Sequence, residues 1–192
     1  MATAQALTKM SFADYVVGED ASPVKREWVN GEAWAMSGGS IEHGALGGSI
    51  HSALLVALRG RPCKPFNSDV RIRVQKTGLA AYPDVSVVCG KVERDPEDDC
   101  AIVNATVLIE VLSPSTEDWD RGGKWNHYRQ MPSLRHYVLF EQDQRRVEFH
   151  TRQADGTWNL RDLGLGECVE LTALSVTLDI DALYEEALAG LG

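Results

Sequence analysis

The sequence predicts a mixed α/β (α+β) domain, in which helices flank a central mixed β-sheet and a β-hairpin precedes it. Helices interrupt the predicted strands without alternating with them regularly, which favours a mixed sheet over a Rossmann or barrel fold. The 192 residues show no internal repeat, low-complexity tract or obvious linker. We therefore expect one domain over residues 1–192, with its core at about residues 11–185.

The N-terminal part predicts a short helix, a hairpin and a longer helix. The short helix is expected over residues 11–17, and residues 25–36 alternate around an Asn-Gly pair that is typical of tight hairpin turns. Ser40 can cap a helix over residues 41–59. Four apolar side chains recur on one face of that helix: Leu46, Ile50, Leu54 and Leu58.

The middle of the chain predicts three strands. In residues 64–75, valine and isoleucine alternate with Arg71, Arg73 and Gln75, a pattern typical of a half-exposed strand with a basic outer face. A second strand is expected over residues 81–89. The charged segment that follows, KVERDPEDDC, is predicted to be a solvated surface loop. The third strand, 105–112, is apolar over its last six residues except for Glu110, which places it in the centre of the sheet.

The C-terminal part predicts a helix, a hairpin, two short strands and a closing helix. Ser115 and Asp118 resemble a capping box with aspartate in place of the usual glutamate, so a helix is expected from there to about Gln130, where Met-Pro ends it. The remaining expected elements are a hairpin of 136–141 and 145–152, strands at 158–163 and 168–171, and a helix over 180–189.

Composition and charge limit the classes of function. The hydrophobic content of 44% and the charged content of 24% are ordinary for a globular domain, and no apolar run reaches the roughly 18 residues of a membrane span. The N-terminus shows no secretory signal pattern. The net charge of −9 disfavours tight, non-specific binding to nucleic acid, although it permits a local basic face.

The four cysteines are scattered, without a CxxC pair or zinc-finger spacing. They are Cys63, Cys89, Cys100 and Cys168. We expect reduced thiols that pack in the protein, with a disulfide or a zinc site as the alternative. Together with the missing signal pattern, this predicts a cytoplasmic location.

Glu110 is the most informative residue of the sequence. It stands within VLIEVL, where its neighbours require burial, and a lone ionised carboxylate there would be strongly disfavoured. It must therefore have a basic partner, hydrogen-bond donors or a bound cation, or stay protonated. A satisfied ion pair in the core is the competing interpretation of this residue.

Asp84 raises the same question at the start of YPDVSVV. After a proline, an aspartate is often a turn or strand-edge cap. Taken together with Glu110, however, it suits a hard divalent cation, because Mg²⁺ binds one or two carboxylates and completes its octahedron with water and substrate oxygens. Two neighbouring strands can hold two carboxylates at the required separation.

Lys124 is the third candidate, in the helix that follows the Glu110 strand. A lysine near a metal-bound water can orient it and stabilise developing negative charge. The competing interpretation is an i,i+4 pair with Asp120, worth a few tenths of a kcal/mol. Gly122 and Gly123 count against a purely structural helix, because each costs roughly 1 kcal/mol relative to alanine. Glycines fit there if another group must approach the backbone closely.

Two long stretches carry a family resemblance, YPDVSVV and LIEVLSPSTEDWDRGGKWNHYRQMPSLRHYVLF. They resemble the Uma-two family of bacterial proteins, a restriction-endonuclease-like group of the PD-(D/E)XK nuclease superfamily. The upstream Asn-Gly-Glu hairpin, MSGGSIEHG and NSDVRIRV are also similar, so that the resemblance covers roughly residues 11 to 185. It implies a restriction-endonuclease-like fold.

The resemblance also implies site residues. Asp84 and Glu110 would be the metal-binding carboxylates for Mg²⁺ or Mn²⁺, and Lys124 the catalytic lysine. The superfamily lysine usually lies two residues after the glutamate, where this chain has Leu112. The lysine would then have moved to the helix, which is chemically reasonable because the reaction needs an ammonium near the phosphate and no particular sequence offset.

Further residues are candidates at the rim of the site. His43 and Glu42 open the long helix, where surface or capping roles compete with a site role, and Tyr128 lies one helical turn beyond Lys124. Asp69 could point at the site or make a strand-end hydrogen bond. Candidate phosphate contacts are Arg71 and Arg73, together with the arginines of the turn at Arg59 and Arg61.

The sequence thus predicts a Mg²⁺-dependent endonuclease that hydrolyses phosphodiester bonds of nucleic acid, with DNA as the first expectation. The alternative is a catalytically inactive binding or assembly module that keeps the nuclease fold, which the low basic content supports. An edge strand near the C-terminus could support a homodimer.

Overall fold

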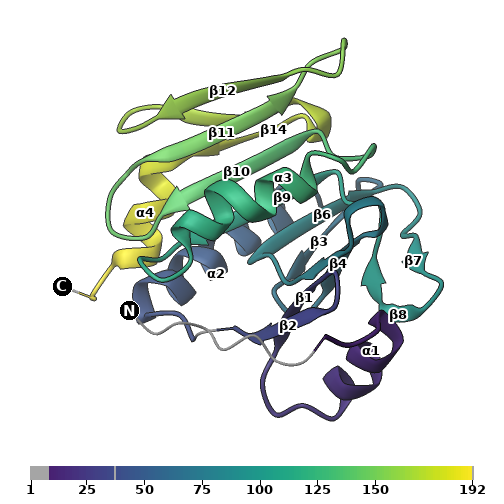
Figure 1. Ribbon diagram of the computed structural model, residues 1–192. Coiled ribbons are helices and arrows are strands. Elements are labelled where there is room, and N and C mark those ends of the chain that lie inside the picture. Colours follow the sequence, from purple (N-terminus) through teal and green to yellow (C-terminus); the bar gives the residue numbers. More distant parts are fainter. Residues whose placement is uncertain (1–8, 37, 192) are drawn as a thin grey trace.

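The computed structural model describes residues 9–36 and 38–191, and Figure 1 shows their arrangement. The described residues form a mixed α+β fold, with two six-stranded mixed sheets, a two-stranded sheet and four α-helices. The strand order of the central sheet is β12-β11-β10-β9-β6-β3. The second sheet has the order β2-β1-β5-β4-β8-β7, and β13 pairs with β14 alone. The predicted fold class is confirmed.

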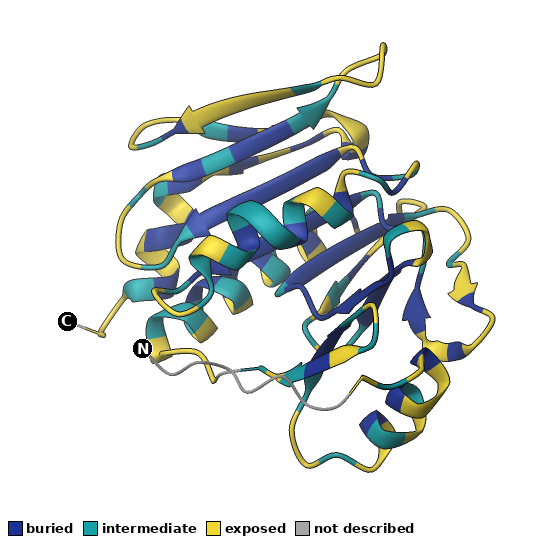
Figure 2. Cartoon of the chain, viewed as in Figure 1, coloured by how far each residue is buried: buried dark blue, intermediate teal, exposed yellow. Residues whose placement is uncertain are grey.

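The central strand is β9 (Val107–Leu112), as predicted. Every one of its residues is buried, and Figure 2 shows the neighbouring strands of this sheet largely in dark blue. It runs parallel to β10 (His136–Glu141) and antiparallel to β6 (Val85–Cys89). The outer strands of this sheet are β3 (Cys63–Asn67), β11 (Val147–Arg152) and β12 (Trp158–Leu163).

The alternation of β9 sends its side chains into two different cores. Ile109 and Val111 pack in one core with α2 (Ile41–Ala57) and α4 (Ile180–Leu188). Leu108 and Leu112 pack in the other with Tyr128, on the side of the helix that crosses from β9 to β10. Because strand side chains alternate, Glu110 faces this second side. The predicted apolar stripe of α2 is confirmed, since all four of its members are buried.

The crossover helix contains a π-helical turn, Trp119–Lys124, followed by α3 (Trp125–Tyr128). The structure explains one of its two glycines. A Cβ on Gly123 would come within 1.8 Å of the Trp119 ring, whereas one on Gly122 would meet nothing within 4 Å. The group that approaches the backbone is therefore an indole of the same helix. The π turn also aligns Asp120 and Lys124 on one side of the helix.

The N-terminal elements follow the predicted order. Helix α1 (Phe12–Asp20) is capped by the Ser11 hydroxyl, and the hairpin consists of β1 (Arg26–Val29) and β2 (Glu32–Ala35). Its turn has positive φ at both residues, 48° at Asn30 and 97° at Gly31, which is typical of a type I′ turn. The hairpin packs Trp28 and Ala33 against α1.

The predicted basic outer face is wrong. In β4 (Arg71–Val74), Arg71 and Arg73 are only 3% and 8% exposed. Arg71 binds the carboxylate of Asp98 at 2.8 Å, and the guanidinium of Arg73 lies 3.9 Å from the centre of the Phe12 ring. Both arginines are thus structural, and they are not the phosphate contacts that the alternating pattern suggested.

The charged segment predicted to be a solvated loop is also wrong in part. It forms β7 (Arg94–Asp95) and the start of β8 (Asp98–Ile102), and Asp95 and Asp98 are buried beside the two arginines. The charges of the two segments compensate each other across the second sheet, which neither pattern reveals alone. The sheet is completed by β5 (Leu79–Ala81), with a 3₁₀ turn at Gln75–Thr77 before it.

The C-terminal hairpin, the strand β13 (Cys168–Leu171) and the closing helix are confirmed. An additional strand, β14 (Val176–Asp179), follows a 3₁₀ turn at Thr172–Leu174. Among the described residues, no helix combines the length and the apolar character needed to cross a bilayer.

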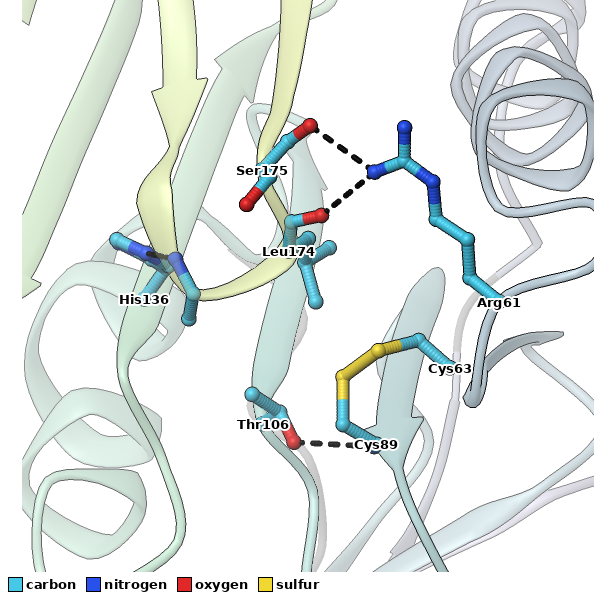
Figure 3. Close-up of a disulfide and its surroundings, with 8 residues drawn as sticks. Arg61, Cys63, Cys89, Thr106, His136, Leu174 and Ser175 are labelled. Atoms are coloured by element: carbon cyan, nitrogen blue, oxygen red, sulfur yellow. Dashed lines mark hydrogen bonds between the residues drawn. A yellow bond between two sulfur atoms is a disulfide. The ribbon is translucent and has the colours of Figure 1, made fainter.

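The expectation of four reduced cysteines is wrong for one pair. Cys63 and Cys89 form a disulfide between β3 and β6, and they are direct cross-strand partners with Cα atoms 3.9 Å apart (Figure 3). Cys100 and Cys168 are free. A disulfide is typical of oxidising compartments, so one ground for the cytoplasmic expectation is removed, and the location itself stays a prediction.

Candidate active site

Lys124 lies at the centre of a buried charge cluster. Its ammonium is 3.2 Å from Glu110 Oε1, 3.0 Å from Glu27 Oε1 and 2.9 Å from Asp120 Oδ1. Each of the four residues is at most 4% exposed. The cluster joins the hairpin strand β1, the central strand β9 and the π turn, so that three parts of the chain meet at one ammonium.

Aromatic side chains hold the carboxylates of this cluster in place. The Trp119 indole N–H donates to Glu27 Oε2 at 2.8 Å, and the Tyr128 hydroxyl donates to Glu110 Oε1 at 3.3 Å. Tyr137 donates its hydroxyl to the backbone carbonyl of Asp120. These bonds come from the apolar core around the crossover helix, which makes the arrangement rigid.

The cluster carries more negative than positive charge. Burial raises the pKa of Glu110 well above its ordinary value; the Lys124 ammonium opposes that shift, while Asp120, Asp84 and Glu27 add to it. Burial alone would lower the pKa of Lys124, but the carboxylates of Glu110, Glu27 and Asp120 outweigh burial and raise it. Lys124 is therefore held as a cation among three carboxylates, and an additional cation or proton would be favoured there.

Asp84 approaches the same place from the residue before β6. Its Oδ2 accepts a hydrogen bond from the backbone N–H of Val111 at 2.7 Å and lies 3.4 Å from His43 Nε2. The hydrogen bond to Asp84 raises the pKa of His43, against the opposing effect of its partial burial. Both side chains are 19% exposed, so this side of the site is more exposed than the Lys124 cluster, whose members are at most 4% exposed.

One small cavity of about 50 Å³ joins these groups. Its walls include Asp84, Glu110, Lys124 and His43, with Ser113 and Thr116 from the start of the crossover segment. A cleft of about 660 Å³ begins at Asp84 and His43 and runs along the first half of α2. The three residues predicted to converge do therefore border one cavity, which opens towards a larger cleft.

The donor set fits a hard divalent cation supplemented by water. Among the described residues, no group of three or more His, Cys, Asp and Glu side chains is arranged to hold a metal ion by itself. Mg²⁺, however, often uses only one or two carboxylates together with water and substrate oxygens. Asp84 and Glu110 border one cavity, and the buried carboxylates beside it carry an excess of negative charge. A divalent cation would offset this charge.

Several predicted residues lie elsewhere. Asp69 is exposed and binds Lys25 at 2.6 Å, and it borders neither the small cavity nor the cleft. Glu42 does not border the cavity either: hydrogen bonds from its own backbone N–H and from Ser40 lower its pKa at the start of α2. Tyr128 is fully buried beneath Glu110, so it is a support and not a rim residue.

The arginine turn does not contact the site either. Arg61 donates to the backbone carbonyls of Leu174 and Ser175, both at 3.0 Å, and so ties the end of α2 to the turn between β13 and β14 (Figure 3). Arg59 is exposed at the same end of α2, which is the end opposite to His43. Neither arginine borders the cavity or the cleft.

Glu27 is the main residue that sequence reasoning missed. A signal for it was present in the hairpin. The two-residue turn at Asn30-Gly31 pairs Glu27 with Trp34 and Trp28 with Ala33 across the strands. Trp28 and Ala33 are required by the N-terminal core, so the alternating pattern sends Glu27 to the opposite face, towards Lys124. Asp120 was recognised only as a helix partner of Lys124.

Comparison with known proteins places the chain in a family. The family model described as "Uma2: Putative restriction endonuclease" matches residues 12–181. In Synechocystis sp. (strain ATCC 27184 / PCC 6803 / Kazusa), the uncharacterized protein slr1290 is 31% identical over 176 residues, which is 92% of each chain. The uncharacterized protein sll1609 of the same organism is 30% identical over 171 residues, 89% of this chain and 94% of that protein.

A solved structure is similar in fold. The crystal structure of a "putative nuclease belonging to DUF820" from Anabaena variabilis ATCC 29413 superposes with a TM-score of 0.74 at 16% sequence identity. The match covers 95% of this chain and 99% of that one. The shared fold extends over nearly the whole molecule, as the family match does. This chain belongs to the Uma2 family of restriction-endonuclease-like proteins.

Proposed function

We propose that this protein is a metal-dependent nuclease that hydrolyses phosphodiester bonds of nucleic acid, with DNA as the first substrate to test. The observation that carries the proposal is the single cavity bordered by Asp84, Glu110 and Lys124. Family membership and the nuclease-like fold support it. The fold by itself would not be sufficient support, because proteins of one fold can have many functions and the residues of the site determine which one is present.

Asp84 and Glu110 are the residues that would hold Mg²⁺ or Mn²⁺. When bound, such an ion would supply Lewis-acid stabilisation of the charge on the phosphate oxygens. Asp84 is positioned for this role by the Val111 N–H, and Glu110 by Tyr128 and by the pairing of its strand on both sides. The different exposure of the two carboxylates leaves the Asp84 side open to solvent and substrate.

Lys124 would act through its charge. All three of its close partners are carboxylates, and they raise the pKa of Lys124 against the opposing effect of burial, so the ammonium stays protonated. A fixed positive charge beside the attacked phosphate stabilises the negative charge that develops in the transition state. In this arrangement Glu27 and Asp120 are positioning residues, because they hold the ammonium at the cavity wall.

The cleft along α2 would admit the sugar-phosphate backbone. Three glycines of α2 border it, Gly44, Gly47 and Gly48, and a Cβ on Gly44 or on Gly48 would meet nothing within 4 Å. Glycine within a helix costs roughly 1 kcal/mol relative to alanine. Packing against the described residues does not require glycine at Gly44 or Gly48. An open cleft wall next to Asp84, however, does require small side chains at these positions.

Loss of either carboxylate should abolish cleavage. We expect Glu110→Gln and Asp84→Asn to lose Mg²⁺-dependent hydrolysis of DNA in a gel assay, and Asp69→Asn, whose side chain lies outside the cavity, to retain it. Thermal unfolding of each variant would show whether the fold is intact. Wild-type rates in folded Glu110→Gln would refute the mechanism.

A second candidate function is a nuclease-fold binding or assembly module without catalysis. The net charge of −9 favours it, as does the Lys124 ammonium, whose three close contacts are all carboxylates. Calorimetric titration with Mn²⁺ discriminates between the two. Heat of binding that disappears in Asp84→Asn supports the nuclease, and no binding by the wild type supports the module.

The homodimer stays a prediction. Strand β12 is an outer strand of the central sheet and is largely exposed, as its yellow colour in Figure 2 shows. Leu160 on this strand is 52% exposed. An unpaired edge of this kind can pair with a second copy. Light scattering after size exclusion would measure the mass, and Leu160→Lys should shift a dimer to monomer.

A further inference from the structure

A second cavity adjoins the candidate active site. Its volume is about 270 Å³, and Trp34, Trp119, Glu27 and Lys124 are among its walls. It shares Lys124, Met36 and Thr116 with the small cavity that Asp84 and Glu110 border. A molecule whose phosphate lies at those carboxylates would therefore have its neighbouring group at the two indoles.

The two indoles form one wall of this cavity. Their ring centres are 5.4 Å apart, and their planes are inclined by 78°. Trp119 packs partly against the core of the crossover helix and donates its N–H to Glu27. Trp34 belongs to none of the hydrophobic clusters formed by the described residues, and it is only half-buried.

The position of Trp34 follows from the hairpin register. It is the cross-strand partner of Glu27, so both side chains project from the same face of the hairpin, towards the crossover helix. The tight turn and the packing of Trp28 on the opposite face fix this register. A large indole outside the core, held rigidly at the mouth of a cavity, points to a ligand with a π-face.

Polar groups border the same cavity. Glu27 is 3% exposed, and its Oε1, although 3.0 Å from Lys124 Nζ, has no hydrogen-bond partner among the described residues. A carboxylate has acceptor capacity beyond one ionic contact. The cavity thus combines aromatic faces with a buried acceptor, which matches the faces and the N–H edges of a nucleobase.

We propose that this cavity receives an unstacked nucleobase of the substrate strand, adjacent to the phosphodiester that is cleaved. The inference rests on the proposed function and adds the class of substrate: a strand whose base can leave the stack, as in single-stranded or frayed nucleic acid. Stacking on indoles tolerates any base, so the site would sense the unpaired state more than the sequence.

The test measures binding of a short single-stranded oligodeoxynucleotide by fluorescence anisotropy, with Ca²⁺ in place of Mg²⁺ to offset the charge of the site. Trp34→Ala should bind roughly tenfold more weakly, whereas Trp34→Phe, which keeps a ring, should stay within about threefold of wild type. Because Trp34 lies outside the core clusters, both variants should keep the wild-type melting temperature.

A scan of the oligonucleotide with single abasic sites locates the base. One position should reproduce the roughly tenfold loss with wild type and cause no further loss with Trp34→Ala. A flat scan, equal affinity of Trp34→Ala, or no binding by the wild type would overturn the base site. Mg²⁺-dependent cleavage is assayed separately. Cleavage together with equal affinity for all abasic oligonucleotides would refute only the base site. An affinity loss at one abasic position that depends on Trp34, without any cleavage, would refute only the nuclease proposal.

Discussion

Lys124 and Arg121 lie three residues apart on one helix, and each contacts three carboxylates. Arg121 binds Glu117, Glu141 and Glu148, with its side chain 27% exposed and that of Glu117 42% exposed. Lys124 and its partners are almost completely buried. Each cluster combines one cation with three carboxylates, so the difference between them lies in their exposure to solvent. Water screens the excess negative charge of the Arg121 cluster, whereas in the Lys124 cluster the protein or a bound cation must offset it.

The largest expected difference concerns removal of the two cations. Lys124→Met leaves three buried carboxylates without their partner and should lower the free energy of unfolding by about 3–5 kcal/mol. Arg121→Met removes a partly solvated cation and should cost about 1 kcal/mol or less. Urea unfolding of both variants measures this, and equal losses would break the comparison.

The next effect is stabilisation by metal. Mn²⁺ at about 100 times its dissociation constant should raise the free energy of unfolding by about 2.7 kcal/mol, because an ion held by Asp84 and Glu110 would bind the folded protein only. Asp84→Asn should lose this increment. Glu148→Gln, which alters only the Arg121 cluster, should keep it. Calorimetric melting with and without Mn²⁺ provides the readout, and an unchanged increment in Asp84→Asn would place the ion elsewhere.

Access to the buried cluster can be tested on α2. Gly48→Ala should stabilise the protein by about 1 kcal/mol, because alanine favours the helix and the new methyl group meets nothing within 4 Å. The same methyl group narrows the cleft that leads to Asp84 and should slow cleavage. Leu55→Ala, on the same helix but outside the cleft, serves as the control for turnover. A stabilised variant with unchanged turnover would argue against this route of entry.

The smallest effect is the response to salt. At about 1 M NaCl, where screening acts within roughly 3 Å, the destabilisation by Arg121→Met should shrink towards zero. The destabilisation by Lys124→Met should hardly change, since the members of that cluster are at most 4% exposed and bulk salt screens buried charges far less. Unfolding at low and high salt measures both, and similar salt slopes would contradict the assigned difference in burial.

Local patterns were sufficient for most of the fold. The apolar run around Glu110 predicted the central strand, the Asn-Gly pair predicted the hairpin, and the stripe of α2 predicted its buried face. The patterns failed where charges compensate over long range. The alternating pattern of its own strand predicts that Arg71 is exposed. The side chain is buried because its charge pairs with Asp98, 27 residues away, which offsets the cost of removing the guanidinium from water.

The candidate site divides in the same way. Glu110 was identified because burial of a charge is visible in one strand, Asp84 because it forms a carboxylate pair with Glu110, and Lys124 because an ammonium beside such a pair fits metal-assisted hydrolysis. The family resemblance implies all three. Glu27 was missed, because its partner is almost a hundred residues distant in the sequence. The Cys63–Cys89 bridge was missed for a related reason: its two cysteines become neighbours only when β3 and β6 pair.

That bridge has a consequence for how the protein loses its structure. Strands β3 and β6 are antiparallel, so the covalent tie lies at the end of the ladder remote from Asp84, which immediately precedes the first residue of β6. Reduction of the bridge should therefore loosen the sheet first at this end of the β3–β6 ladder, at a cost of about 3.5 kcal/mol for a sequence separation of 26 residues. Asp84, near the opposite end, keeps its hydrogen bond from the Val111 N–H, so reduction should lower the stability of the whole domain before it disturbs the candidate site.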